Sequence, residues 1–239
     1  MRNTPNRDWL GWSGKVEKSL DLMVYSPIMY LDPSVKGICP YQGECIKSCL
    51  GPHSGRGVMA NVRKARRIKT MAYLADPKAA MEDIIIDVRR HQRKAAKYGW
   101  TFAPRLNGTS DIIFTDVMEA LPNVCFYDYT KNVVAYRQWL RGSYPHRNHH
   151  LTLSYDPTSV PMDVCMDVLA EGGSVALAFA GPLPDTYNGY RVINGDATDA
   201  RFLDRKVHNI PDGIGFIVGL SIKGTKSAKA RAQSTGFAV

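Results

Sequence analysis

The stretch TFAPRLNGTSDIIFTDVMEALPNVCFYDYTKNVVAYRQWLRG, residues 101–142, alternates predicted strands with predicted helices. TFAPRLNG and VCFYDYT have the pattern of short strands, and FTDVMEAL and NVVAYRQWLRG have the apolar spacing of helices. The alternation continues through the strand HHLTLSYD, the helix VPMDVCMDVLAEGG and the strand SVALAFAG. Strands and helices that alternate in this way form right-handed βαβ units around a parallel sheet.

The number of predicted strands indicates the architecture. YRVING and GFIVGLSI bring the total to about six strands. A closed eight-stranded barrel usually takes about 250 residues, and this chain has 239 residues and fewer strands. We therefore predict the α/β class, with a partial or small parallel TIM-like barrel. An open doubly wound sheet is the alternative, and no G-x-G-x-x-G segment follows any strand to indicate a dinucleotide fold.

The composition and periodicity of the sequence change at residue 59. Residues 1–58 are rich in Gly, Pro, Tyr and Trp, and we expect them to form an N-terminal segment that packs on a main domain of residues 59–239. The main domain opens with two predicted helices. The first contains NVRKARRIKTMAYLA, and the second has Asp76 as its N-cap, Pro77 in its first turn and Gly99 as its stop.

The composition favours a cytoplasmic protein. Hydrophobic residues make up 44% of the chain, but no run of about 18 apolar residues suggests a membrane span. The N-terminus lacks the apolar stretch of a secretory signal. Disulfides are rare in the cytosol, so the five cysteines indicate metal ligands before bridges. The net charge of +9 permits binding to nucleic acid without requiring it.

The segment GICPYQGECIKSCLGPHSGRG, residues 37–57, contains Cys39, Cys45 and Cys49 in a C-x5-C-x3-C spacing. A helical turn would place Cys45 and Cys49 on one face, and the flexible approach to Cys39 lets it join them. Thiolates select zinc, copper(I) or iron–sulfur clusters. A structural zinc site needs a fourth ligand, for which His53 is the candidate. We favour a 4Fe-4S cluster, in which three cysteines leave one iron open; zinc and three unrelated cysteines are the alternatives.

The carboxyl ends of the predicted strands carry many polar side chains. In parallel α/β folds, ligands bind at these ends and at the loops that follow them. Each residue alone could be a turn or a helix cap, so their recurrence at one edge is the stronger signal. The predicted substrate-binding residues are Arg105, Asn107, Ser110, Asp111, Asp128, Lys131, Asp196 and Asp199.

Other reactive or charged residues have plainer interpretations. Cys125 begins a predicted strand and Cys165 lies within a predicted helix, so we expect both in the core. The basic helix is most often a solvated face, but it can also contact phosphate. In that alternative the nucleic-acid contacts are Arg63, Lys64, Arg66, Arg67 and Lys69.

Three motifs resemble a known family. CPYQGECIKSCLG, then APRLNGTSDI, then VCFYDYTK occur in the order and with the chemistry of the phage gene product eighty-eight family. The resemblance runs from about Cys39 to Lys131. It implies a bacteriophage protein with an iron–sulfur cluster on a barrel-like fold.

The layout also resembles radical S-adenosylmethionine enzymes, in which three clustered cysteines lie at the top of a partial barrel. That resemblance implies that the open iron binds S-adenosylmethionine. The sequence departs from their usual C-x3-C-x2-C spacing, and their Gly-Gly-Glu segment is absent after the second strand.

Two functions follow as hypotheses. The first is an iron–sulfur protein with a redox or radical enzymatic role on a small polar or anionic substrate. The second is a metal-stabilised nucleic-acid-binding protein without catalysis, in which zinc or a cluster holds a loop that could not fold alone.

Overall fold

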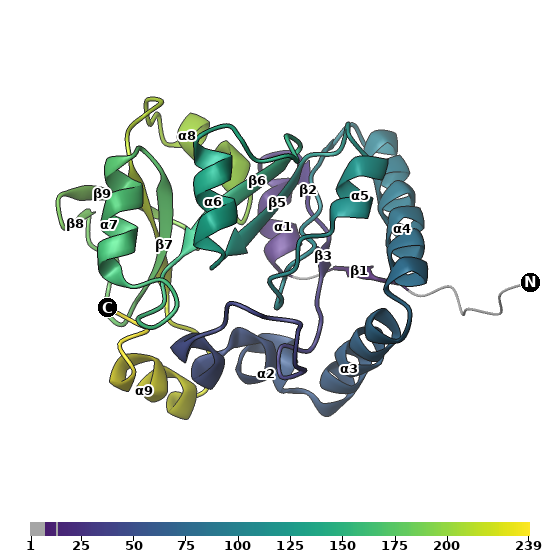
Figure 1. The fold of residues 1–239 in the computed structure, drawn as a ribbon, viewed down its shortest axis with the longest axis horizontal. Coiled ribbons are helices and arrows are strands. Elements are labelled where there is room, and N and C mark those ends of the chain that lie inside the picture. Colours follow the sequence, from purple (N-terminus) through teal and green to yellow (C-terminus); the bar gives the residue numbers. More distant parts are fainter. Residues whose placement is uncertain (1–7, 13) are drawn as a thin grey trace, which may run out of the picture.

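Six strands form the central sheet of the computed structural model, which describes residues 8–12 and 14–239 (Figure 1). Their order across the sheet is β5-β6-β7-β10-β9-β8. All neighbours pair in parallel except β8, which runs antiparallel to β9. The strands are β5 (Phe126–Thr130), β6 (His149–Ser154), β7 (Ser174–Phe179), β8 (Thr186–Tyr187), β9 (Tyr190–Asn194) and β10 (Phe216–Ser221).

The sheet is open, so the class predicted from the sequence is confirmed but the TIM-like barrel is not formed by the described strands. β10 lies between β7 and β9, whereas a barrel would place consecutive strands side by side. The β8–β9 hairpin turns through Asn188 and Gly189, whose φ angles are 49° and 82°. Positive φ at both central residues is the two-residue hairpin geometry that Asn-Gly favours. This turn reverses the chain and makes β8 one end of the sheet.

The predicted strand at residues 101–108 is mostly extended chain outside the main sheet. Only β4 (Thr101–Phe102) is a strand, and it pairs in parallel with β2 (Val24–Tyr25). Hydrogen bonds continue past Pro104, where the Arg105 N–H donates to the Pro27 carbonyl at 3.0 Å. β3 (Ile28–Met29) then pairs antiparallel with β1 (Leu10–Gly11). The early part of the chain thus supports the segment that leads into the main sheet.

The two helices predicted after residue 59 are present as α3 (Ala60–Ala75) and α4 (Pro77–Lys97). The Asp76 carboxylate accepts the Ala79 N–H at 2.9 Å and caps α4, as the sequence predicted. Gly99 has a φ of 68° and ends the following turn. Among the described helices, none combines the length and the apolar character needed to cross a membrane.

The main sheet is covered on both faces. α6 (Val133–Leu140) and α7 (Met162–Ala170) pack on one face through an apolar cluster that includes Tyr136 and Val168. The other face packs against the 3-10 helix η3 (Arg201–Leu203), which continues into α8 (Asp204–Val207). Burial on both faces explains the continuous apolar runs of β7 and β10. The remaining helices beside this core are α1 (Gly14–Leu20) and α5 (Thr115–Ala120).

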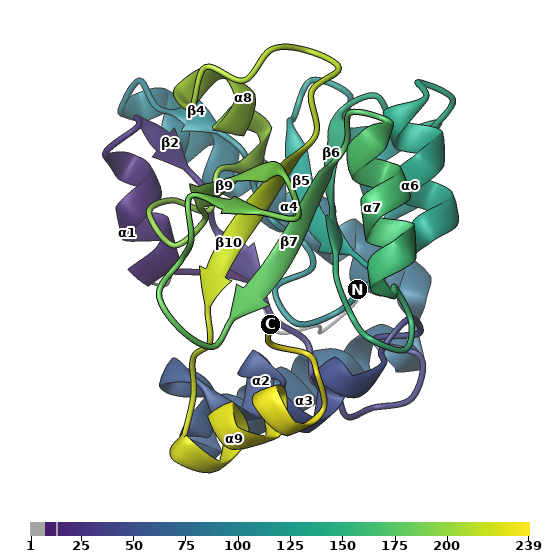
Figure 2. The same cartoon turned by 90° about the vertical axis from the view of Figure 1, so that its left-hand side faces the viewer.

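A layer of helices lies beyond the carboxyl ends of β7 and β10. The arrows of both strands point toward α2 (Leu50–His53), α3 and α9 (Lys226–Ser234) in Figure 2. The 3-10 helices η1 (Glu44–Ser48) and η2 (Gly55–Val58) belong to the same layer of chain, and η1 packs against α9. The cysteine segment and the C-terminal tail therefore meet at the end of the sheet where parallel α/β folds bind ligands.

Candidate functional site

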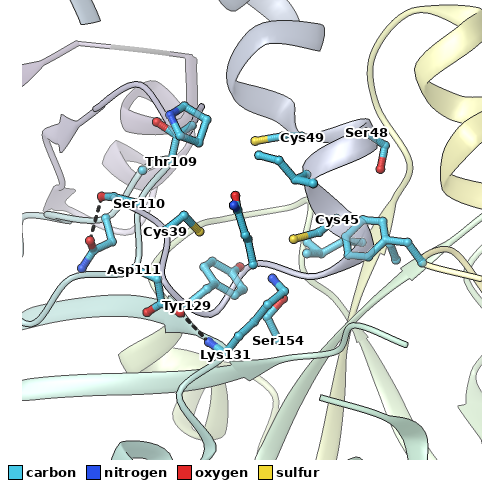
Figure 3. Close-up of a pocket in the computed structure, with 18 of the residues that line it drawn as sticks. Cys39, Cys45, Ser48, Cys49, Thr109, Ser110, Asp111, Tyr129, Lys131 and Ser154 are labelled. Carbon is cyan, nitrogen blue, oxygen red and sulfur yellow. Dashed lines mark hydrogen bonds between the residues drawn. The ribbon is translucent and has the colours of Figure 1, made fainter. Parts of the chain in front are cut away.

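The three clustered cysteines line one pocket of about 230 Å³. Figure 3 shows their sulfur atoms facing a common space from the loop, from η1 and from the residue after η1. Cys45 and Cys49 are joined by a 3-10 helix and not by the α-helical turn that the sequence predicted. The Gly51 N–H donates to Cys49 Sγ at 3.4 Å. The loop thus collects thiols that are separated along the chain.

Asp156 anchors the cysteine loop to the end of β6. Its carboxylate accepts the backbone N–H groups of Cys45 at 2.8 Å and Glu44 at 3.2 Å, and also bonds within its own turn to Thr158. Burial alone would raise the pKa of Asp156, but these hydrogen bonds outweigh burial and lower it to about 2. A Cβ at Gly43 would overlap this carboxylate, so the close approach requires glycine.

The C-terminal helix α9 holds the loop from the other side. The Arg231 Nε donates to the Lys47 carbonyl at 2.8 Å, and the Thr225 N–H donates to the His53 carbonyl at 3.2 Å. The chain then returns to the sheet, where Val239 exchanges backbone hydrogen bonds with the end of β7. Phe237 from this return segment lines the pocket. The C-terminal tail therefore forms a wall of the pocket.

The structure brings five of the eight predicted substrate-binding residues into the cysteine pocket. These are Arg105, Asn107, Ser110, Asp111 and Lys131. They reach the pocket from the loop after β4 and from the end of β5, and the hydrogen bonds of Asp111 tie these two segments together.

Lys131 places a positive charge in the pocket, where it could bind an anionic ligand. Its Nζ lies 3.3 Å from Ser154 Oγ. Burial alone would lower the pKa of Lys131, but Cys45, Asp111 and Cys39 outweigh burial and raise it. A buried ammonium needs a negative partner, and the thiols supply one when they are ionised or bound to a metal.

Without a bound cation, the three pocket thiols are held in their neutral form. Burial, and then the charge of Asp111, raises the pKa of Cys39 to about 12, while Lys131 acts to lower it. Burial is also the largest cause that raises the pKa of Cys45 and of Cys49. A cation among the three sulfurs would favour the thiolates, because metal ligation requires the deprotonated form.

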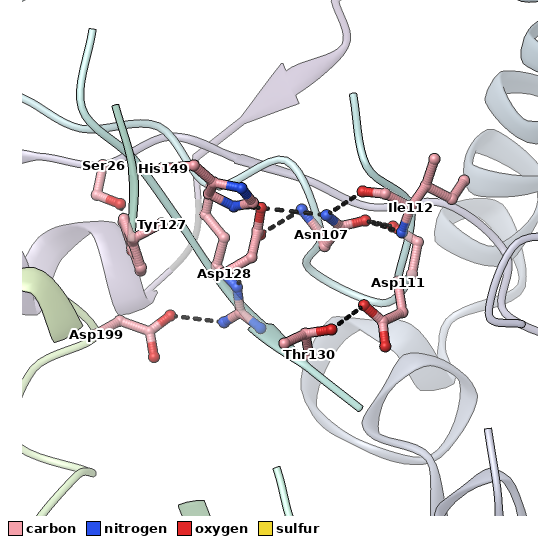
Figure 4. Close-up of polar contacts among 11 residues, drawn as sticks. Ser26, Asn107, Asp111, Ile112, Tyr127, Asp128, Thr130, His149 and Asp199 are labelled. Carbon is pink, nitrogen blue, oxygen red and sulfur yellow. Dashed lines mark hydrogen bonds and ion pairs between the residues drawn. The ribbon is translucent and has the colours of Figure 1, made fainter. Parts of the chain in front are cut away.

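Asp111 fixes the loop after β4 to the end of β5. Its carboxylate accepts the Thr130 hydroxyl (Figure 4) and the Lys131 N–H (Figure 3), each at 2.8 Å. Burial raises the pKa of Asp111, and the two hydrogen bonds only partly offset that cause. The same loop is closed by Asn107, whose side-chain oxygen accepts the Ser110 hydroxyl at 2.7 Å.

Asp128 lies behind the pocket and does not line it. Its carboxylate accepts the Asn107 N–H at 2.7 Å and contacts His149 Nε2 at 3.1 Å, and both groups are buried (Figure 4). Arg105 completes this network through an ion pair with Asp199 at 2.9 Å and stacks over the Tyr129 ring at 4.6 Å. These contacts make Asp128 a support for the residues that face the pocket.

Asp196 and Asp199 line a neighbouring cavity of about 70 Å³ instead of the cysteine pocket. The two cavities share Leu220, Ser221 and Lys223 as a common wall. Asp196 is ion-paired with Lys223 and accepts the Ser221 N–H at 2.9 Å. The sheet order explains the separation, since these aspartates follow β9, which lies outside β10.

The basic helix uses most of its predicted phosphate-binding side chains for local contacts. Arg66 donates to the Gly51 carbonyl at 2.6 Å, and Arg67 pairs with Asp32 at 3.3 Å. Arg63 donates to the Val58 carbonyl and Lys69 donates to the Trp9 carbonyl. The side chain of Lys64 is exposed. Arg66 and Lys69 therefore tie α3 to the rest of the molecule.

Sequence reasoning missed three residues that shape the pocket. Asp156 precedes Pro157, and Asp-Pro marks a turn in which the aspartate caps N–H groups, a signal that the sequence analysis does not use. Tyr129 faces the pocket from β5, although tyrosine in a strand is equally typical of a core-facing position. Phe237 had no local signal, because only the return of the C-terminal tail to β7 brings it there.

The donor set suits a sulfur-ligated metal group. Three thiols and a half-buried lysine line the same space, and Cys125 and Cys165 are not part of it. His53, the candidate fourth zinc ligand, is also not a lining residue. Within residues 8–12 and 14–239, no three His, Cys, Asp or Glu side chains are arranged to hold a single metal ion.

Comparison with known proteins identifies the family. Neither the curated proteins nor the solved structures contain a significant match. The sequence model of the family described as gene product 88 matches residues 12–238. That match covers the cysteine loop, the sheet and the C-terminal helix, and so reaches well beyond the three motifs on which the resemblance was based. The chain belongs to the gene product 88 family.

Proposed function

We propose that this protein binds an iron–sulfur cluster of the 4Fe-4S type through Cys39, Cys45 and Cys49. The observation that carries the proposal is that three thiols from one loop line a single pocket that also contains the half-buried Lys131. Three cysteine ligands leave one iron of such a cluster open to another ligand. Zinc is the less favoured metal, because a closed structural site needs a fourth ligand and His53 is outside the pocket.

The walls of the pocket suit a small polar or anionic ligand beside the cluster. Lys131 supplies a half-buried positive charge, and Ser110 supplies a hydroxyl group. When bound, a cluster with an open iron supplies electrons to a ligand. We infer a redox or radical role, with S-adenosylmethionine as the candidate ligand of the open iron by analogy with radical S-adenosylmethionine enzymes. The family suggests a bacteriophage protein that acts in the host cytoplasm.

The residues of the pocket would serve this role in distinct ways. Lys131 would balance the negative charge of the thiolates and orient an anion. Asp111 would hold Lys131 in place through its backbone N–H. Asp156 would hold the backbone of Cys45, so that its sulfur keeps its direction. None of these tasks requires the sheet to close into a barrel.

Anaerobic metal analysis tests the proposal. Protein isolated without oxygen should contain iron and acid-labile sulfide, and should absorb visible light through sulfur-to-iron charge transfer. Replacing Cys39, Cys45 or Cys49 with serine should remove most of the iron and sulfide. Cys125→Ser is the matched control, because Cys125 is also half-buried but lies outside the pocket. A colourless protein with zinc would reject the cluster. Full cluster content in all three serine variants would reject these cysteines as its ligands.

Ligand binding at the open iron has a separate test. Adding S-adenosylmethionine to the reduced, cluster-loaded protein should change the electron paramagnetic resonance spectrum if it reaches the iron. An unchanged spectrum together with normal iron and sulfide content would reject S-adenosylmethionine and leave the cluster proposal intact.

Metal-stabilised nucleic-acid binding without catalysis is the second candidate. We place it second because Arg66, Arg67 and Lys69 already make local contacts in the structure. If α3 binds phosphate, affinity for DNA should fall steeply with salt, and Lys64→Gln should weaken it. Arg141→Gln is the control, because it removes an exposed positive charge that follows α6 and is not part of α3. Absence of binding at low salt would reject this function.

A further inference from the structure

A second cavity, of about 360 Å³, lies at the opposite end of the sheet from the cysteine pocket. It is lined by the first residues of β7 and β10, Ser174 and Phe216, and by His150 near the start of β6. Its size is within the range of small-molecule sites, which is about 300–1,000 Å³. Because parallel α/β folds bind their ligands at the other end of the strands, this cavity is separate from the proposed cluster site.

Arg201 brings an incompletely used positive charge to this cavity. Its side chain is fully buried, and its Nε makes no hydrogen bond with any residue that the structure describes. Its Nη2 donates to the Thr198 carbonyl, and its Nη1 lies 3.4 Å from the Asp204 carboxylate. Burial raises the pKa of Asp204 despite Arg201. Asp199 also acts on Arg201, but its carboxylate is ion-paired with Arg105 at 2.9 Å.

Arg205 adds a second positive charge to the cavity. Its hydrogen bonds to described residues end on the backbone carbonyls of Gly172, Pro211 and Ile214. Carbonyl oxygens accept hydrogen bonds but carry no net charge, so these contacts fix the guanidinium without cancelling its charge. The group also stacks over the Phe216 ring at 5.1 Å.

The pKa of His150 reflects the positive charges around the cavity. Burial, followed by the nearby His149, Arg201 and Arg205, lowers the pKa of His150 to about 3. No ion pair joins His150 to a described carboxylate, and its ring contacts Trp139 edge-on at 4.7 Å. Glu171 is the one carboxylate among the lining residues, and it pairs with Arg141 at 3.0 Å and Arg137 at 3.8 Å.

We propose that this cavity binds a phosphorylated small molecule, with its phosphate facing Arg201, Arg205 and His150. Two guanidinium groups suit a dianionic phosphate better than a single carboxylate, because planar guanidinium forks match phosphate oxygens. The cavity is larger than an inorganic ion, and Trp139 and Phe216 provide apolar surface for the organic part. Binding would add negative charge beside the buried Arg201 and the half-buried Arg205.

Calorimetric titration at constant ionic strength tests this proposal with phenyl phosphate, inorganic phosphate and phenol as probes. Phenyl phosphate should bind saturably and more tightly than inorganic phosphate, and phenol should bind least. His150→Gln and Arg205→Gln should each lower the affinity for phenyl phosphate by about tenfold, since losing a hydrogen bond to a charged group costs roughly this much. Lys131→Gln changes the cysteine pocket, and Lys206→Gln removes an exposed charge beside Arg205 that does not line the cavity. Both variants should bind phenyl phosphate normally.

Several outcomes would overturn the proposal. These are no saturable binding by the unaltered protein, unchanged affinity in both cavity variants, and loss of binding in Lys131→Gln, which would place the anion in the cysteine pocket. If the arginine variant fails to fold, nuclear magnetic resonance decides the question in the unaltered protein. The imidazole signal of His150, assigned by its absence from His150→Gln, should move as phenyl phosphate is added. A stationary signal at saturating probe would reject the site.

Discussion

Asp156 shows how one carboxylate positions a functional loop. It is fully buried, and its two oxygens accept N–H groups from the cysteine loop and from its own turn. Its partners are donors in each case, so the ionised form is the form that the fold selects. The direction of Cys45 thus depends on a residue more than one hundred positions away in the chain.

Asp156→Asn should destabilise the protein by about 1–3 kcal/mol at neutral pH, because the new amide group would face the Cys45 N–H and leave it unsatisfied. The pKa of Asp156 is lowered in the fold from 3.8 to about 2. Its stabilisation is therefore complete above the unfolded-state pKa and is lost as pH falls through that range toward 2. Urea unfolding should show the difference between variant and parent shrinking in acid.

The control for this experiment is Asp163→Asn, which changes an exposed carboxylate on α7. It should unfold at nearly the same urea concentration as the parent at neutral pH. Equal stability of Asp156→Asn and the parent at neutral pH would show that the carboxylate does not hold the loop.

Lys131 should control how readily the pocket thiols ionise in the metal-free protein. Its charge acts to lower the pKa of Cys39, Cys45 and Cys49, against the effect of burial. Lys131→Met should raise these pKa values and slow alkylation by iodoacetamide severalfold at mildly alkaline pH, since one pKa unit is about tenfold in thiolate. Mass spectrometry measures the rate at each cysteine.

Cys125 is an internal control for the alkylation experiment. Its pKa is raised by burial, with no contribution from Lys131. Its alkylation rate should therefore be the same in Lys131→Met and in the parent. Uniform slowing of all cysteines would indicate a general change in the fold, and unchanged pocket cysteines would refute the electrostatic role of Lys131.

At the scale of elements, α9 and the tail act as a clamp on the cysteine loop. α9 begins with Thr225, whose hydroxyl accepts the Ala228 N–H, and its far end leads to the pairing of Val239 with β7. The clamp joins the end of the chain to η1, α2 and the sheet at once. A short helix with a low apolar content is stabilised mainly by such tertiary contacts.

Removal of residues 226–239 should loosen the loop without unfolding the sheet. The Lys47 carbonyl would lose its hydrogen bond to Arg231, and Phe237 would no longer cover the pocket. Hydrogen–deuterium exchange should become faster in η1 and α2, and remain unchanged between β5 and β6. Thr225→Ala is a milder variant, expected to cost about 1 kcal/mol through loss of the cap. Unchanged exchange in η1 after truncation would contradict the clamp.

At the scale of the whole molecule, buried charges connect the early strands to the late part of the chain. Arg105 follows β4, which pairs with the N-terminal segment, and its partner Asp199 precedes η3. Both side chains are buried. The ion pair therefore joins regions that share no ladder of the main sheet.

Arg105→Met should destabilise the protein by about 3–5 kcal/mol, because a buried Asp199 would lose a charged partner. The double variant Arg105→Met with Asp199→Asn should recover part of that loss, since the uncompensated charge is also removed. Chemical denaturation of the parent, both single variants and the double variant gives the coupling energy. Strict additivity of the two single changes would show that the pair does not join these regions.

The sequence by itself determined most of the helices, most of the strands and many of the side chains that line the cysteine pocket. Periodicity reports backbone geometry, so α3, α4 and the units from β5 to β7 were predictable from local pattern. Arg105, Asp111 and Lys131 line one pocket because the hydrogen bonds of Asp111 tie the loop after β4 to the end of β5. The Asn188-Gly189 hairpin was also readable in the sequence, although the prediction did not use it.

Only the tertiary structure decided the order of the strands and therefore whether the sheet closes. Placing β10 between β7 and β9 depends on which apolar faces bury each other over long separations, and local pattern carries no such information. The same order moved Asp196 and Asp199 away from the cysteines. Asp156 and Phe237 reached the pocket for the same reason: hydrogen bonds and packing between distant segments place them, and those contacts exist only once the chain has folded.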